Sequence, residues 1–283
     1  MSVESKWNSR RIDASVVRTA ARARTAASAH HLAVPGLLSL ALAAGVLACG
    51  GAQTAEPHTE NDWTRAADEA ALDGRWAARW TTVTETPAPL GAVVRSTQRR
   101  VALLDATESE EGVRFHGEVC ALEVESSTSL ASTVIPEAYM RALPSLSLVA
   151  TRADGALRFA PTVEVVGAEV APGVTLPTTA EDPAVFDADE DGQPGVTVRV
   201  TGMAGGELYF VQRREIAATL RYEGGRWAGP ITWSFEQSVL GATSARLRQP
   251  RETRVADDPS AHVLELVPVQ DETPCAEAGG VFR

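Results

Sequence analysis

Apolar and polar residues alternate most clearly between Arg226 and Leu240. A period of two places one face of a β-strand in the core and the other face in solvent. The pair Gly224-Gly225 precedes this segment and suits a tight turn with positive φ angles. The pattern therefore predicts a hairpin with the preceding segment, Glu207–Tyr222. One parity of the second strand carries Trp227, Ile231, Trp233, Phe235 and Val239, and the other carries Thr232, Ser234, Glu236 and Ser238.

The segment Glu207–Tyr222 is long for one unbroken strand, since most strands have between three and ten residues. Its apolar residues keep one parity on both sides of a polar run, Gln212–Glu215. A polar interruption of this kind is typical of a β-bulge or a corner. We therefore expect this strand to bulge or bend at Gln212–Glu215.

Similar signals predict further strands along the chain. The dipeptide Asp154-Gly155 marks another hairpin turn, Pro136–Leu143 suits one or two helical turns, and Asp62 can cap a short helix that ends at Ala71. The predicted strands are Arg75–Thr84, Ser96–Asp105, Val113–Glu125, Ser147–Thr151, Ala156–Ala160, Val196–Val200 and Val263–Val267.

Many strands with little helix indicate an all-β fold. We expect a single antiparallel β-barrel or β-sandwich of about eight or more strands, formed by residues 63–283. The composition does not change sharply after residue 62. A split into two smaller domains near Ala180 is the alternative.

The first 48 residues have the layout of an export signal. Arg18, Arg22 and Arg24 precede an apolar stretch, Leu32–Ala48. This stretch is short for a membrane-spanning helix, and Pro35 interrupts it, whereas its length fits the apolar region of a signal peptide. Residues 1–48 are therefore predicted to be removed during export.

The apolar stretch ends in Val46-Leu47-Ala48-Cys49-Gly50, which resembles the lipobox of bacterial lipoproteins. The resemblance implies that Cys49 is acylated, that it anchors the protein to a lipid bilayer, and that residues 49–62 form a flexible tether. Gly50 stands where the inner-membrane retention signal of the family has aspartate, which favours the outer membrane. An ordinary signal peptide with an incidental cysteine is the alternative.

Export also determines what we expect of the other two cysteines, Cys120 and Cys275. Thiols of an exported protein meet an oxidising compartment, where two leftover cysteines usually pair. We therefore predict a Cys120–Cys275 disulfide, with two free buried thiols as the alternative.

The formal net charge of −11 and the lack of a basic cluster with interleaved aromatic residues argue against nucleic-acid binding.

The most specific chemical pattern of the chain is an acidic segment. Asp187, Asp189 and Asp191 stand at alternate positions, and Gly192 follows them. Alternate carboxylates can converge on one point, and a glycine lets the backbone turn beneath them. Because clustered negative charges repel, this arrangement favours a divalent cation with oxygen ligands. We predict a calcium site formed by the three carboxylates and a backbone carbonyl near Gln193.

This segment resembles the Asp-x-Asp-x-Asp-Gly loops of EF-hands, dockerins and thrombospondin-type repeats. It departs from the EF-hand at the twelfth position, where Val198 replaces the expected glutamate, and it leads into a predicted strand. Its form through Val196 also resembles a segment of uncharacterised envelope lipoproteins of myxobacteria and their relatives, a resemblance that carries no function. An acidic surface turn is the alternative, because Asp, Gly and Pro favour turns.

Gly74-Arg75-Trp76 resembles the Gly-x-Trp start of lipocalin-like barrels, in which the tryptophan closes one end of a ligand cup. A tryptophan at the start of a strand in an ordinary core is the favoured alternative. The sequence contains no nucleophile elbow, zinc-binding helix, phosphate-binding loop or dinucleotide fingerprint. We therefore expect a membrane-anchored envelope lipoprotein with a non-catalytic, calcium-stabilised β domain of structural or binding role. A lipocalin-like carrier of a small apolar ligand and a hydrolase of unknown type are the alternatives.

Overall fold

A computed structural model describes residues 70–88, 92–202, 205–249 and 252–282. The predicted signal peptide, Cys49, the tether 49–62 and most of the predicted helix that ends at Ala71 lie outside these residues. All described residues belong to one compact unit, and Ala180 lies within it. No helix in these ranges is long and apolar enough to cross a membrane.

Nine strands of the structure match the nine that the sequence predicts, although most of them run further at one or both ends. Two short strands, β4 and β10, were not predicted. Helix α2 occupies the segment predicted to form helical turns. The strands are β1 (Gly74–Pro87), β2 (Val93–Ser109), β3 (Gly112–Ser126), β4 (Ala131–Val134), β5 (Leu146–Ala153), β6 (Ala156–Val166), β7 (Val196–Gly202), β8 (Gly206–Glu223), β9 (Arg226–Ala242), β10 (Arg254–Val255) and β11 (Val263–Pro268). The helices are α2 (Glu137–Ala142) and α3 (Cys275–Ala278), with single 3₁₀ turns at η2 (Pro259–Ala261) and η3 (Gly279–Phe282).

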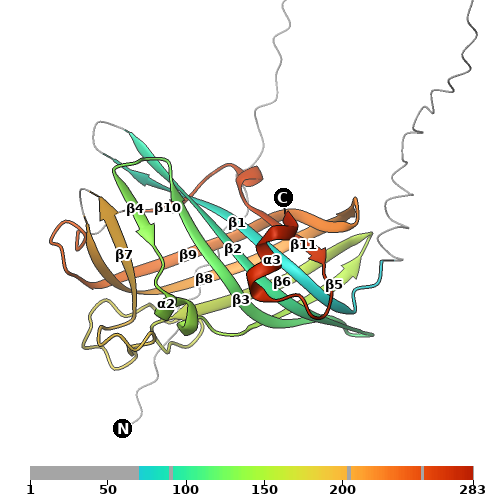
Figure 1. Ribbon diagram of the computed structural model, residues 1–283. Coiled ribbons are helices and arrows are strands. Elements are labelled where there is room, and N and C mark those ends of the chain that lie inside the picture. The colour runs from blue at the N-terminus through green and yellow to red at the C-terminus, as the bar shows by residue number, and fades with distance from the viewer. Residues whose placement is uncertain (1–69, 89–91, 203–204, 250–251, 283) are drawn as a thin grey trace, which may run out of the picture. The chain divides into compact units, whose positions relative to one another are not determined.

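The strands close into a barrel, which decides between the two architectures that the sequence allowed. Eight of them form a ring in the order β8-β6-β5-β3-β2-β1-β11-β9, and β9 pairs again with β8 (Figure 1). Every one of these pairings is antiparallel. Closure of the ring satisfies the backbone hydrogen bonds of strands that would otherwise be exposed edges.

At one end of the barrel, two further strands, β7 and β4, extend the sheet beyond the ring. The first residues of β8 extend beyond β6, and β7 pairs with them, so that Val196 lies opposite Phe210 and Val200 lies opposite Gly206. Strand β4 then pairs with the outer edge of β7. Helix α2 lies at this end, where Tyr139 packs against Phe210 with 6.3 Å between ring centroids. The connection between β6 and β7, residues 167–195, also belongs to this end.

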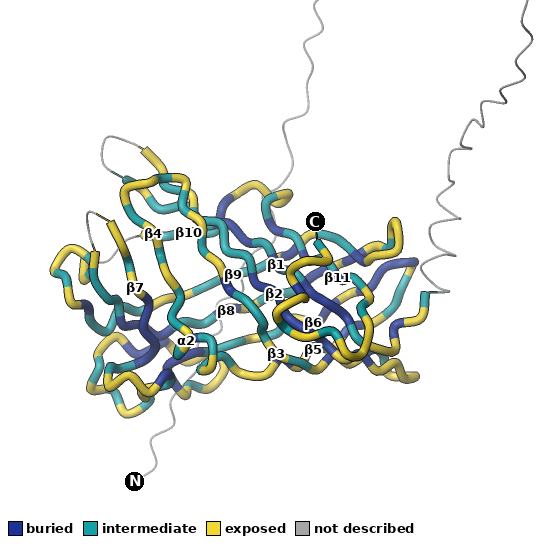
Figure 2. Tube along the Cα trace, in the orientation of Figure 1, coloured by how far each residue is buried: buried dark blue, intermediate teal, exposed yellow. Residues whose placement is uncertain are grey.

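Apolar side chains pack in the interior of the barrel, and Figure 2 shows the buried residues in dark blue along the strands. Trp76 of the Gly-x-Trp motif is 3% exposed and lies in this core, where its Nε1 donates a hydrogen bond to the carbonyl of Leu72 at 2.8 Å. Large side chains fill the barrel because alternate residues of every strand point inward. Fully buried members of the core include Leu104, Phe115, Leu157, Leu220, Trp227 and Leu266.

Two hairpin turns have the backbone that the sequence predicts. Asp154 and Gly155 have φ angles of 53° and 67°, and Gly224 and Gly225 have φ angles of 58° and 81°. Two consecutive positive φ angles match the twist of the flanking strands and favour glycine and aspartate. The alternation in Arg226–Leu240 thus belongs to β9, the second strand of the β8–β9 hairpin.

The predicted bulge at Gln212–Glu215 is wrong in position. These residues pair in continuous register with β9, from Gln212 opposite Gln237 to Glu215 opposite Ser234. The register shifts instead between Tyr209 and Phe210. The polar run has another cause, because Arg214 is buried and forms an ion pair inside the barrel.

The C-terminal segment covers the outer face of β1 to β3 and is held there by a disulfide. Cys120 and Cys275 are bonded, with 5.0 Å between their Cα atoms and a sequence separation of 155, which confirms the predicted pairing. Beneath helix α3, Ala278 packs against Val101 and Leu103. In Figure 1, α3 lies across this part of the sheet.

Candidate functional site

The acidic loop, Asp187–Gly195, lies just before β7. Its ends are held together by two backbone hydrogen bonds, from the Ala188 N–H to the Gly195 carbonyl at 2.9 Å and from the Gly195 N–H to the Phe186 carbonyl at 3.0 Å. Asp187 and Gly195 form an isolated parallel bridge. The loop therefore returns to its starting point and brings its side chains together.

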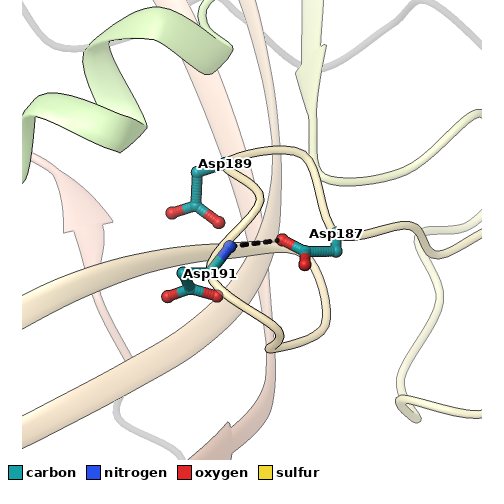
Figure 3. Close-up of side chains that lie close together, drawn as sticks. All are labelled: Asp187, Asp189 and Asp191. Atoms are coloured by element: carbon teal, nitrogen blue, oxygen red, sulfur yellow. Dashed lines mark hydrogen bonds between the residues drawn. The ribbon is translucent and has the colours of Figure 1, made fainter.

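The aspartates of the acidic loop accept backbone hydrogen bonds that fix its shape, and Figure 3 shows the one from Asp191 to Asp187. Asp187 accepts the N–H groups of Asp191 at 3.1 Å and Gly192 at 2.8 Å. Asp191 accepts the N–H of Gln193 at 2.8 Å. An ionised carboxylate has about four acceptor positions, so each aspartate keeps capacity to contact a cation.

Gly195 fixes the position of the acidic loop on the barrel wall. Its φ angle is 83°, and a Cβ atom at this position would lie 2.3 Å from the carbonyl oxygen of Phe210 in β8. A side chain would therefore clash with backbone that cannot move independently. Gly192 also has a positive φ, 84°, but a Cβ atom there would meet no neighbour within 4 Å. The backbone conformation, and not a lack of space, therefore favours glycine at this position.

Asp189 is the buried member of the acidic loop, with 6% of its surface exposed, whereas Asp187 and Asp191 are exposed. Its Oδ2 accepts the N–H of Thr197 in β7 at 2.9 Å. Its Oδ1 is buried and has no hydrogen-bond partner among the described residues. An unpaired buried carboxylate oxygen is unfavourable, and a bound cation would offset that cost.

The pKa of Asp189 is raised above its ordinary value. Burial is the main cause, and the negative charges of Asp191 and Asp187 add to it, whereas the hydrogen bond from Thr197 acts in the opposite direction. Both burial and the neighbouring charges disfavour the ionised form in the protein alone. A divalent cation at this position would favour the ionised form, because it supplies the missing positive charge.

The spacing of the three carboxylates suits one calcium ion. One oxygen from each of Asp187, Asp189 and Asp191 lies within 4.8 Å of the others. Calcium contacts its oxygen ligands at about 2.3–2.6 Å, so two ligands on opposite sides of one ion are about 5 Å apart. The structure thus brings the three predicted aspartates together. Gln193 belongs to the same loop, and its N–H donates to Asp191. A backbone carbonyl near Gln193 as a further calcium ligand stays a prediction.

A second charged group, which the sequence pattern did not reveal, lies inside the barrel. We call Arg100, Glu164 and Arg214 the arginine–glutamate cluster. Glu164 binds Arg100 at 2.8 Å through one carboxylate oxygen and Arg214 at 2.7 Å through the other. Arg214 also donates to the side-chain oxygen of Gln98 at 2.7 Å. All three charged side chains are at least 87% buried.

Burial and charge act in opposite directions within this cluster. Burial alone would raise the pKa of Glu164, but the guanidinium groups of Arg100 and Arg214 hold that pKa below its ordinary value. Burial raises the pKa of the nearby Tyr139 hydroxyl, so this group stays neutral. Glu164 is therefore ionised at neutral pH and is the carboxylate partner of both arginines.

A small cavity of about 40 Å³ adjoins the arginine–glutamate cluster, with Trp80, Phe159 and Ile216 in its wall. A carrier of a small apolar ligand needs a pocket of about 300 Å³ or more. A larger depression near the β3–β4 connection is open and mainly polar. Neither feature favours the carrier alternative.

His262 is buried, and its ring makes hydrogen bonds that hold parts of the fold together. Its Nδ1 accepts hydrogen bonds from the Val83 N–H and the Trp233 Nε1–H, each at 3.2 Å. Its Nε2 donates to the carbonyl of Ala256 at 2.8 Å. Both ring nitrogens are thus engaged within the fold, and this residue gives no support to the hydrolase alternative.

The resemblances in the sequence are confined to short segments, namely the lipobox-like residues Val46–Gly50, the acidic loop and the Gly-x-Trp start. Comparison with known proteins finds no matching family model, no matching curated protein and no matching solved structure.

Proposed function

We propose that the protein is an exported envelope lipoprotein, anchored to a bilayer through acylated Cys49, whose β-barrel domain is non-catalytic and is stabilised by calcium at the acidic loop. Its role is structural, or it binds a partner through its surface. The lipobox-like sequence at Val46–Gly50 supports the anchor, and Gly50 favours the outer membrane.

One observation carries the calcium part of the proposal. The Oδ1 atom of Asp189 is buried without a hydrogen-bond partner among the described residues, and it belongs to a group of three carboxylates that could contact one ion. An acidic surface turn needs no buried carboxylate, because solvated charges repel one another only weakly. Missing EF-hand ligands suggest weak affinity, with a dissociation constant of about 10⁻⁴–10⁻³ M.

Calcium should raise the thermal stability of the protein. At a calcium concentration tenfold above the dissociation constant, linkage predicts a gain of about 1.4 kcal/mol, or about 3–6 °C for a domain of this size. Thermal unfolding of chelator-treated protein with and without about 10 mM calcium measures the gain. Asp189→Asn should abolish it, because the variant removes the buried charge.

Asp105→Asn is the matched control for this experiment. Asp105 is an aspartate of β2, with a side chain that is 68% exposed, and it lies outside the acidic loop. This variant should keep the full calcium response. Equal melting temperatures of the unmodified protein in calcium and in chelator would show that the acidic loop is a surface turn.

Cys49 should carry the lipid anchor. Mass spectrometry of the mature protein should find an N-terminal Cys49 with acyl chains, and Cys49→Ser should remain uncleaved or appear in the soluble fraction. Stable anchoring needs more than one acyl chain, because a single chain binds a bilayer only marginally. An unmodified Cys49 within an intact, uncleaved chain would contradict the anchor.

A further inference from the structure

The arginine–glutamate cluster has an unbalanced charge. Arg100 and Arg214 are cationic, and the carboxylate that faces them is Glu164. Among the residues that the structure describes, the other ionisable group that acts on both guanidinium groups is Tyr139, which is neutral. One positive charge is therefore left over inside the barrel, where burying an unpaired charge costs several kcal/mol.

Arg100 carries the unsatisfied part of this charge. Its Nη1 donates to Glu164, but its Nε and Nη2 atoms are buried and have no hydrogen-bond partner among the described residues. The guanidinium carbon of Arg100 lies 5.9 Å from the centre of the Trp80 ring. The ring attracts the cation but supplies no full negative charge. Burial and the charge of Arg214 lower the pKa of Arg100, and Glu164 offsets part of this effect.

The small cavity beside Arg100 limits what could neutralise this charge. Its volume is about 40 Å³, and one water molecule needs about 10–15 Å³ of cavity volume. About three heavy atoms therefore fit. Most of the residues that line the cavity are apolar, and the charged ones are Arg100, Arg214 and Glu164. This mainly apolar lining disfavours a strongly hydrated divalent anion, and the single excess positive charge calls for a monovalent one.

We propose that the barrel binds one small monovalent anion, of the size of chloride or formate, in the cavity beside Arg100. The Nε–H and Nη2–H groups of Arg100 would donate to the anion, as guanidinium groups do to anions elsewhere. The anion completes a neutral cluster of two arginines and two negative charges. This site is independent of the acidic loop and of the proposed calcium binding.

Thermal unfolding in matched salts tests the proposal. The unmodified protein is compared in sodium chloride, sodium formate and sodium gluconate at equal ionic strength, with a calcium chelator in every sample. Gluconate is too large for the cavity. Chloride or formate at tenfold above its dissociation constant should raise the melting temperature by about 3–6 °C over gluconate. The salt that gives the larger gain identifies the preferred anion.

Arg100→Met and Arg99→Met form a matched pair. Arg100→Met removes the excess charge and leaves Glu164 paired with Arg214, so its melting temperature should be the same in all three salts. Arg99, the neighbour on β2, is 43% exposed and pairs with Glu125, so its variant should respond as the unmodified protein does. An undiminished gain in Arg100→Met would overturn the proposal, as would equal melting temperatures of the unmodified protein in the three salts.

Diffraction gives a second readout that does not require a variant to fold. Crystals of the unmodified protein grown in sodium bromide should show an anomalous peak within hydrogen-bonding distance of Arg100 Nε or Nη2. The anomalous signal of bromide distinguishes a bound monovalent anion from a water molecule. Absence of a peak in the cavity, at bromide concentrations that give peaks elsewhere on the protein, would overturn the proposal.

Discussion

Replacing Cys120 and Cys275 by alanine should lower the free energy of unfolding by about 5 kcal/mol. The disulfide joins residues that are 155 positions apart, and in the chain-entropy model a loop of this length gives about that stabilisation. Whole domains have only about 5–15 kcal/mol of stability. We therefore expect a fall of about 10–20 °C in the melting temperature, measured by thermal unfolding under non-reducing conditions.

The disulfide variant also has a local consequence. The bond holds α3 against the outer face of β2 and β3, where Ala278 is fully buried. Hydrogen exchange at the amides of residues 275–282 should therefore become faster than exchange in β8. The single variant Cys120→Ala should lose as much stability as the double variant, because either change removes the bond. A loss below about 1 kcal/mol would contradict the assignment of a stabilising role to this disulfide.

Glu164→Gln should be the most destabilising conservative substitution inside the barrel. The amide keeps the size of the side chain but removes the carboxylate that pairs with both Arg100 and Arg214. Breaking a buried ion pair in this way typically costs about 3–5 kcal/mol. Urea unfolding at neutral pH measures the loss. Glu125→Gln is the control, because Glu125 is 69% exposed and pairs with Arg99; exposed pairs contribute about 0–1 kcal/mol.

The pH dependence of stability should change in the same variant. The folded-state pKa of Glu164 is lowered, so the stabilisation is fully present above the ordinary pKa of glutamate, about 4.3, and is lost as the pH falls through the lowered value. Glu164→Gln should lose less stability than the unmodified protein on acidification from pH 5 to pH 2. Parallel pH profiles of the two proteins would contradict the ion-pair assignment.

The alternation of side chains was enough to predict most of the barrel because the period of a strand is a local property. It failed for β4 and β10, which have four and two residues and are too short to display a period. Whether the sheets close into a ring depends on pairing between distant strands, such as β11 with β9. No local pattern reports such a pairing.

The arginine–glutamate cluster could have been predicted in part. Arg214 shares its parity with the apolar residues Phe210 and Ile216, which indicates an inward-pointing charge. Glu164 has the opposite parity to Phe159, although both point into the barrel, because the register of β6 shifts between Phe159 and Thr162. The bulge therefore conceals the partner of the arginines from any analysis of alternation.

The convergence of the acidic loop was predictable because its carboxylates are close in sequence. The burial of Asp189 was not, because it depends on how the loop packs. Ala188 packs into the cluster that contains Tyr139 of α2 and Phe210 of β8, residues that are far from it along the chain. The feature that most favours calcium thus comes from tertiary structure, whereas the pattern of aspartates comes from the sequence.

The most direct test of the central claim is the structure of the protein crystallised with calcium. We expect one calcium ion inside the acidic loop, with oxygens of Asp187, Asp189 and Asp191 at about 2.3–2.6 Å and the Oδ1 atom of Asp189 among its ligands. Weak affinity requires a calcium concentration of about 10 mM or more. An acidic loop without an ion at that concentration, or with Oδ1 of Asp189 turned away from the ion, would contradict the account.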